Sequence, residues 1–203
     1  WRPRTLGVKG ESRGNVLFGI DYLANPRQHD LGQRVAIIGM GDTAMDVART
    51  SLRHGAQQVT LYSRSNKAGG SREQQLYTQL DGAEFEFGKQ IMEINEQGPL
   101  FRQLLFDENG QPCGEAEELL QAQADSVIIA VSQGPRRRLV DTTKGLEVDE
   151  KGFLVVDEDG QTTLPMVYAA GDVVTGPRNV VQAVAGAKKV VEAMHKKLQE
   201  QNQ

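Results

Sequence analysis

The sequence around residue 40 restricts the fold of this chain more than any other feature, because it places a glycine-rich turn between an apolar run and an amphipathic segment. The run Arg34–Gly39 is rich in β-branched residues, which is typical of a strand buried on both faces of a parallel sheet. From Asp42 to His54 the apolar residues recur at helical spacing, and Gly55 is a helix stop signal. The pattern predicts a strand, a tight turn and a helix that packs back onto the strand.

A second β-branched run, Gln58–Ser63, completes a βαβ unit within the length that such a unit requires. A further helix is expected to begin after Ser71 and to end before Asp81. We expect further strands at 84–87, 91–95, 101–106 and 126–131, the second and third of which form a small meander. The predicted fold class is therefore α/β, a Rossmann-like domain with a parallel sheet, covering helices and a small β-meander.

The character of the sequence changes on either side of this domain. Residues 1–32 contain turn signals around one short apolar segment and are interpreted as a lead-in outside the core. The nucleotide-binding domain is expected at 33–135. Residues 136–203 contain a predicted hairpin around 157–160 and a final helix from about Arg178. The chain opens at Trp1 without an initiator methionine, and we expect it to be a fragment.

The turn after the first strand has the form GxGxxA, which fits the pyrophosphate of a dinucleotide. Gly39 allows the sharp turn, Gly41 allows the backbone to approach the phosphates, and Ala44 allows close packing of helix and strand. The positive end of the helix dipole adds attraction for the anion. A glycine-rich turn without a ligand is the alternative, but the strand before it and the helix after it favour the dinucleotide interpretation.

The end of the second strand indicates which dinucleotide is bound. An NAD site usually has an acidic residue there, whereas this chain has Ser63-Arg64-Ser65. Arg64 can form a charge-assisted hydrogen bond with the 2′-phosphate of NADPH, and Ser63 or Ser65 can donate another. Arg72 is a candidate for a second phosphate contact. Solvated surface charge is the alternative interpretation of both arginines.

Composition excludes several classes of function. A formal net charge of −4 gives no general attraction for nucleic acid. The apolar runs are too short to cross a membrane. The chain has one cysteine and no signal-peptide pattern, so we expect a cytoplasmic location. Cys113 lies in a turn-rich run and is interpreted as an inert loop cysteine.

No set of residues has the spacing of a catalytic or metal site. The three histidines are far apart in the sequence, and the acidic pairs, Glu117–Glu118 and Asp157–Asp159, are interpreted as solvated loop residues. No Gly-x-Ser-x-Gly motif is present, and no tyrosine is followed by a lysine four residues later. We therefore predict cofactor binding without catalytic side chains or a metal.

Several motifs together resemble the NADPH-dependent glutamate synthase small subunit (beta chain) and its relatives, which are flavoproteins with two dinucleotide-binding domains. They stand in the family's order at 39–49, 62–64, 71–73, 125–135 and 169–176. The resemblance implies that an FAD domain is interrupted by the NADPH domain and then resumes. Residues 1–32 and 136–203 would then be remnants of the FAD domain. The early FAD fingerprint is absent from this chain.

The resemblance also implies roles for particular residues. Asp42 stands where asparagine is usual, and a helix N-cap role is expected to survive that change. Ser132 stands where many relatives have glycine. The residues expected to contact the nicotinamide nucleotide are Gly39, Met40, Gly41, Asp42, Thr43, Ala44, Ser63, Arg64, Arg72, Ser132 and Gln133, and those expected near the flavin are Gly171, Asp172, Asn179 and Val180.

The function implied by the resemblance is passage of hydride from NADPH to FAD, and then of electrons to an iron–sulfur partner of the glutamate synthase large-subunit type. The missing half of the FAD domain is a second expected partner. We expect this fragment to bind NADP(H), to retain no FAD and to be inactive alone. The alternative is a non-catalytic module that binds or senses NADP(H).

Overall fold

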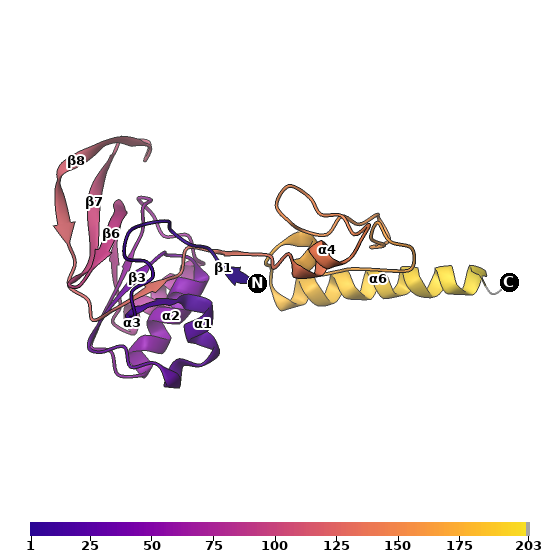
Figure 1. Cartoon of the computed structure of the whole chain (residues 1–203), viewed down its shortest axis with the longest axis horizontal. Coiled ribbons are helices and arrows are strands. Elements are labelled where there is room, and N and C mark those ends of the chain that lie inside the picture. The colour runs from indigo at the N-terminus through magenta and orange to yellow at the C-terminus, as the bar shows by residue number, and fades with distance from the viewer. Residues whose placement is uncertain (202–203) are drawn as a thin grey trace. The chain divides into compact units, whose positions relative to one another are not determined.

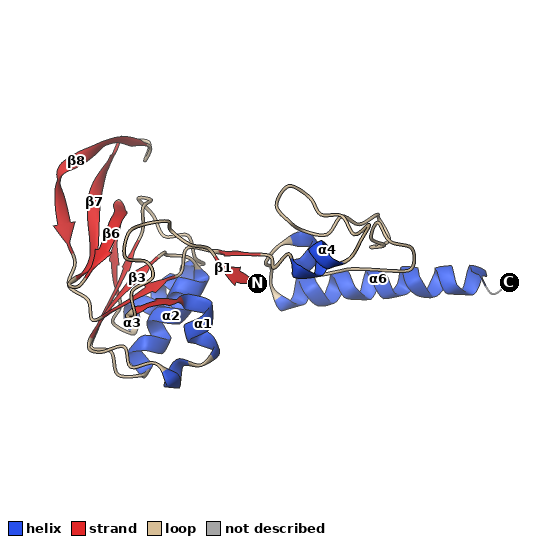
Figure 2. Cartoon of the chain, viewed as in Figure 1, coloured by secondary structure: helices blue, strands red, loops and turns tan. Residues whose placement is uncertain are grey.

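The computed structural model describes residues 1–201, and residues 202–203, the end of the expected C-terminal segment, lie outside the described residues. The chain forms two compact units. One consists of Pro3–Gln133, and the other of the residues from Gly134 onward together with Trp1–Arg2. The short strands β1 (Arg2–Pro3) and β10 (Gln133–Gly134) pair with each other. Figures 1 and 2 show the helices and strands of each unit.

A five-stranded parallel sheet forms the centre of the first unit. Its strands are, in spatial order, β2 (Val16–Phe18), β9 (Ser126–Ile129), β3 (Arg34–Ile38), β4 (Gln58–Tyr62) and β5 (Glu84–Glu86). Ile37 of β3 lies opposite Ile128 of β9 on one side and Leu61 of β4 on the other. These central strands are buried on both faces, as their β-branched runs predict.

Each face of the sheet has its own hydrophobic cluster, because successive side chains of a strand point to opposite faces. Val35 and Ile37 pack with residues of α1 (Gly19–Ala24) and α2 (Asp42–Arg53). Helix α3 (Arg72–Leu80) contacts α2, and Figure 1 shows these three helices beside the sheet. The intervening Ala36 and Ile38 belong to a second cluster on the other face. The sheet is therefore covered on both sides.

A three-stranded antiparallel sheet covers the second face of the parallel sheet. Its strands are β6 (Lys89–Asn95), β7 (Gly98–Phe106) and β8 (Pro112–Gln121). The predicted meander is thus present with one more strand than expected. The loop interpretation of Cys113 and Glu117–Glu118 is wrong, because these residues lie on β8, although all three are exposed. The sequence did not indicate this strand because an exposed, acidic strand lacks the alternation of apolar residues that predicts β structure. Strand β8 is instead stabilised by its hydrogen-bonded pairing with β7.

The interpretation of residues 1–32 as a lead-in outside the core also requires correction. Residues 3–32 belong to the first unit, where β2 pairs in parallel with β9. Tyr22 of α1 is fully buried in the cluster beneath α2, and the 3-10 helix η1 (Pro26–Gln28) follows. A three-residue strand and a six-residue helix are too short to show a clear period in the sequence.

The second unit contains three helices among its described residues: α4 (Arg138–Thr142), α5 (Asp172–Thr175) and α6 (Val180–Gln201). The hairpin expected around 157–160 is present, since Val156 pairs with Thr162 across a turn closed by Asp157 and Gly160. The last helix begins at Val180, two residues after the position predicted. Along residues 1–201, no helix is both long and apolar enough to cross a membrane.

Candidate dinucleotide site

The strand order places the glycine loop at a switch point of the sheet. The chain runs outward from β3 to β4 and β5, and then returns to β9 on the other side of β3. In open parallel sheets, ligands bind at the carboxyl ends of the strands where the order reverses. Gly39 follows β3 and Ala130 follows β9, so both segments lie at that edge.

The two glycines of the loop have different environments. Gly39 has φ +125°, and its N–H donates to the carbonyl oxygen of Tyr62 at 2.9 Å. Gly41 has φ −92° and ψ −178°, and a Cβ atom placed on it would meet no heavy atom within 4 Å. Ala44 is fully buried in the core, and Met40 is also buried. Gly39 therefore supports packing, whereas the backbone at Gly41 borders open space.

The backbone N–H groups of Gly41, Asp42 and Thr43 donate to no acceptor within residues 1–201. The first N–H groups of an α-helix have no partner in their own helix, so they remain available to a ligand or to water. They lie at the positive end of the dipole of α2. These donors can bind an anion.

Asp42 does not cap α2, and the expectation of an N-cap role is wrong. The N-cap residue is Gly41, and Asp42 occupies the first helical position. Its Oδ1 instead accepts a hydrogen bond from the backbone N–H of Ser71 at 2.9 Å. Asp42 therefore places a carboxylate between the glycine loop and the start of α3.

The loop of residues 63–71, which we call the cationic loop, joins β4 to α3, and cationic side chains lie on it and on the first residue of α3. Arg64, Lys67 and Arg72 are exposed, and within the described chain their side chains form no ion pair or hydrogen bond. Because the Ser65 hydroxyl donates to the carbonyl oxygen of Lys67 at 2.6 Å, the Ser63 hydroxyl donates to Ser65 Oγ at 2.9 Å. The sequence interpretation missed Lys67, which its place between the two arginines could have indicated.

Residues 132 and 133 end the first unit beside the same edge. Ser132 has φ +122°, a value that favours glycine, and its carbonyl oxygen accepts from the N–H of Arg4 at 3.2 Å. Gln133 begins β10. Ser132 therefore has a backbone conformation that suits glycine better than serine.

The four residues expected near a flavin belong to the second unit. Gly171 has φ +73° and precedes α5, and Asp172 Oδ1 accepts from the N–H of Arg178 at 3.2 Å. Asn179 Oδ1 accepts from the N–H of Gln182 at 2.9 Å at the start of α6, and Val180 is 77% exposed. Asp172 thus accepts from the loop before α6, and Asn179 accepts from the first turn of α6.

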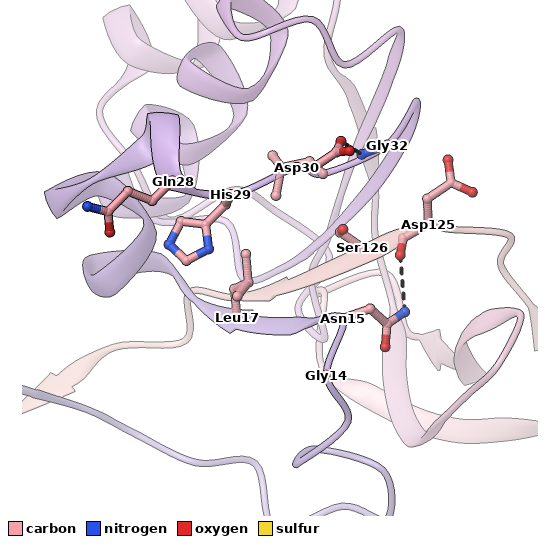
Figure 3. Close-up of a pocket in the computed structure, with 10 residues that line it drawn as sticks. Gly14, Asn15, Leu17, Gln28, His29, Asp30, Gly32, Asp125 and Ser126 are labelled. Carbon is pink, nitrogen blue, oxygen red and sulfur yellow. Dashed lines mark hydrogen bonds between the residues drawn. The ribbon is translucent and has the colours of Figure 1, made fainter.

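A cavity of about 400 Å³ lies at the opposite, amino-terminal edge of the sheet (Figure 3). Asn15 at its wall donates to the carbonyl oxygen of Asp125 at 3.1 Å. The Asp125 carboxylate binds the Arg34 guanidinium at 2.7 Å, and this contact, together with hydrogen bonds from the backbone N–H groups of Arg34 and Gln33, lowers the pKa of Asp125 to about 2. None of the predicted site residues lines this cavity. Across residues 1–201, no group of three or more His, Cys, Asp or Glu residues could hold a metal ion.

Comparison with known proteins identifies relatives across most of the chain. The family described as pyridine nucleotide-disulphide oxidoreductase matches residues 1–187. The chain is 36% identical to the glutamate synthase [NADPH] small chain of Halomonas elongata, over 88% of this chain and 44% of that protein. It is 34% identical to the putative oxidoreductase AegA of Escherichia coli, over 91% of this chain and 33% of that protein. The chain thus spans less than half the length of these relatives.

A solved structure has the same fold. The thioredoxin reductase of T. acidophilum superposes with a TM-score of 0.74 at 24% sequence identity, covering 96% of this chain and 62% of the other. At this level of identity, the likeness supports the α/β Rossmann-like architecture alone.

Proposed function

The chain belongs to the pyridine nucleotide-disulphide oxidoreductase family, and on that premise we propose that it is the NADP(H)-binding portion of a flavin-dependent oxidoreductase related to the glutamate synthase small subunit. The nucleotide lies at the carboxyl edge of β3 and β9 in this proposal. Residues 33–135 form the nucleotide-binding domain, with β2 and α1 completing its sheet and its helical layer.

One observation carries the proposal: three backbone N–H groups that have no acceptor within residues 1–201 lie at the switch point, at the start of α2. A pyrophosphate requires donors of this kind at close range. Open space beside Gly41 allows the phosphates to approach. Thr43 adds a hydroxyl in the same turn, and the buried Ala44 keeps α2 close to the sheet.

The cationic loop supports a preference for NADPH over NADH. Arg64 follows the end of β4, where an NAD site would have an acidic residue, and neither Arg64 nor Arg72 is neutralised by a described partner. The 2′-phosphate of NADPH is negatively charged, so it can form charge-assisted hydrogen bonds with these two guanidinium groups. The name of the H. elongata relative specifies NADPH.

In the whole parent protein, we propose that NADPH reduces FAD and that electrons then pass to an iron–sulfur partner of the glutamate synthase large-subunit type. FAD supplies the hydride acceptor when it is bound, and protein residues supply alignment and electrostatics. Gly171, Asp172, Asn179 and Val180 would border the flavin. This chain has no second glycine fingerprint for FAD, and its single cysteine cannot hold a cluster. The isolated chain is therefore inactive in this proposal.

A parallel calorimetric titration of the purified chain with NADPH and NADH tests the proposal. We expect the wild-type chain to bind NADPH more tightly, and Arg64→Glu to reduce NADPH affinity by about tenfold or more with little change for NADH. Arg27→Glu, which makes the same charge change in η1 beside the opposite edge of the sheet, is the matched control. Binding of neither nucleotide by the wild-type chain would overturn the proposal.

A further inference from the structure

The loop of residues 63–71 returns to the glycine loop through three hydrogen bonds, each donated by a backbone N–H group. The N–H groups of Gly69 and Gly70 donate to the carbonyl oxygen of Met40 at 2.9 and 3.1 Å. The N–H of Ser71 donates to Asp42 Oδ1 at 2.9 Å. The chain that carries Arg64 and Arg72 is therefore attached directly to the proposed pyrophosphate site.

Asp42 supplies the one side chain in these three hydrogen bonds. Gly70 passes so close that a Cβ atom on it would lie 2.9 Å from Asp42 Oδ1 and 3.3 Å from the Asp42 backbone nitrogen. Ser71 is the N-cap residue of α3, and its Oγ accepts from the N–H of Gln74 at 3.3 Å. The carboxylate thus fixes the residue from which α3 begins, and Arg72 is the first residue of that helix.

This carboxylate also has an electrostatic cost. It is exposed at the N-terminus of α2, where the proposed pyrophosphate would bring further negative charge. A residue that served only anion binding would be neutral or donate hydrogen bonds there. The acceptor function toward Ser71 is the interaction that its geometry shows.

We infer that Asp42 is a positioning residue that sets the preference for a 2′-phosphate, acting through Ser71 on the cationic loop and the start of α3. The inference rests on the proposed function. Its chemical requirement is an acceptor oxygen at position 42, and the negative charge is dispensable. An asparagine, which keeps an oxygen at this position, should therefore preserve the preference.

Titration with NADPH and NADH distinguishes a requirement for an acceptor oxygen at position 42 from a requirement for negative charge there. We expect Asp42→Ala to lower the ratio of NADPH to NADH affinity by about fivefold or more, because the Ser71 N–H loses its acceptor oxygen. Asp42→Asn should keep the wild-type ratio and bind both nucleotides at least as tightly. Asp46→Ala is the matched control, since it removes a carboxylate one turn along α2 that forms no hydrogen bond within residues 1–201. It should keep the ratio.

A second pair of variants addresses the donor and covers the case in which Asp42→Ala fails to fold. Ser71 has φ −61°, which proline adopts, so Ser71→Pro removes the N–H without imposing a new backbone angle at that residue. Ser71→Ala removes the cap but keeps the N–H. The inference expects a reduced ratio in Ser71→Pro relative to Ser71→Ala.

The outcomes separate the inference from the proposed function. A wild-type chain that prefers NADPH, with unchanged ratios in both Asp42→Ala and Ser71→Pro, overturns the inference and leaves the proposed function standing. A reduced ratio in Asp42→Asn also overturns it, since charge would then be the cause. A wild-type chain that binds neither nucleotide overturns both.

Discussion

The backbone of Gly39 lies directly against the peptide group of Ala130: a Cβ atom on Gly39 would come within 2.8 Å of the Ala130 carbonyl carbon. Gly39 follows β3 and Ala130 follows β9, the two strands on either side of the switch point. Any side chain at position 39 would force these segments apart beneath the proposed nucleotide. The first glycine of the motif is therefore required for close packing of the segments that follow β3 and β9.

Gly39→Ala should accordingly lower the free energy of unfolding by about 2 kcal/mol or more, because the new Cβ meets backbone and φ is positive. Gly41→Ala is the contrasting variant. With φ −92° and no atom within 4 Å of its Cβ, it should stay within about 1 kcal/mol of the wild type. It should weaken NADPH binding by about tenfold. Urea unfolding and calorimetry measure both, and equal stability of the two variants would contradict the expectation.

The parts of the fold that could be predicted from the sequence are those with a clear local period. The strand at 34–38, the helix at 42–53 and the strand at 58–62 agree closely with the predicted ranges, because burial on both faces or on one helical face leaves a pattern in the residues. The glycine loop could be placed because it lies between two such segments.

The parts that were missed depend on distant contacts. Strand β2 has three residues and is defined by pairing with β9, more than 100 residues later. The bond from Ser71 to Asp42 joins residues 29 positions apart, and no periodicity encodes it. A short acceptor side chain at position 42 fits several roles, so the helix-capping prediction, which is correct for many helices, failed here.

Ser132 should be a site of backbone strain that glycine relieves. At φ +122° a residue with a side chain is destabilised by about 1–3 kcal/mol. Glycine removes this strain, but part of the benefit is lost because glycine has more conformational freedom in the unfolded chain. We expect Ser132→Gly to raise the free energy of unfolding by about 1 kcal/mol in urea titrations. Ser132→Ala, which keeps the Cβ atom, should not. A destabilised Ser132→Gly variant would show that the hydroxyl makes a compensating contact.

Met166 offers an independent case in the second unit. It has φ +59° in a turn where Pro165 precedes it and the N–H of Val167 donates to the carbonyl oxygen of Leu164 at 3.3 Å. Its side chain is 48% exposed, so little packing is lost on its removal. Met166→Gly should stabilise the unit by about 0.5–1 kcal/mol, and Met166→Val, whose branched Cβ resists this conformation, should destabilise it. Thermal melting of the two variants measures the difference.

The contact of Arg34 with Asp125 should make stability depend on pH in the acid range. The Arg34 guanidinium and the N–H groups of Gln33 and Arg34 hold the pKa of Asp125 at about 2, below its ordinary value of 3.8. A depressed carboxyl pKa contributes stability above the ordinary value, and that contribution is lost as pH falls from about 4 through about 2.

Urea unfolding from pH 5 to pH 2 should therefore show a smaller loss of stability in Asp125→Asn than in the wild-type chain. Arg34→Met removes the main cause of the shift and should also flatten the dependence, although it leaves the two backbone donors in place. Because the side chain of Asp125 is 34% exposed, solvent screening will make the effect modest. An Asp125→Asn variant with the same pH dependence as the wild type would mean that other carboxyl groups govern the acid response.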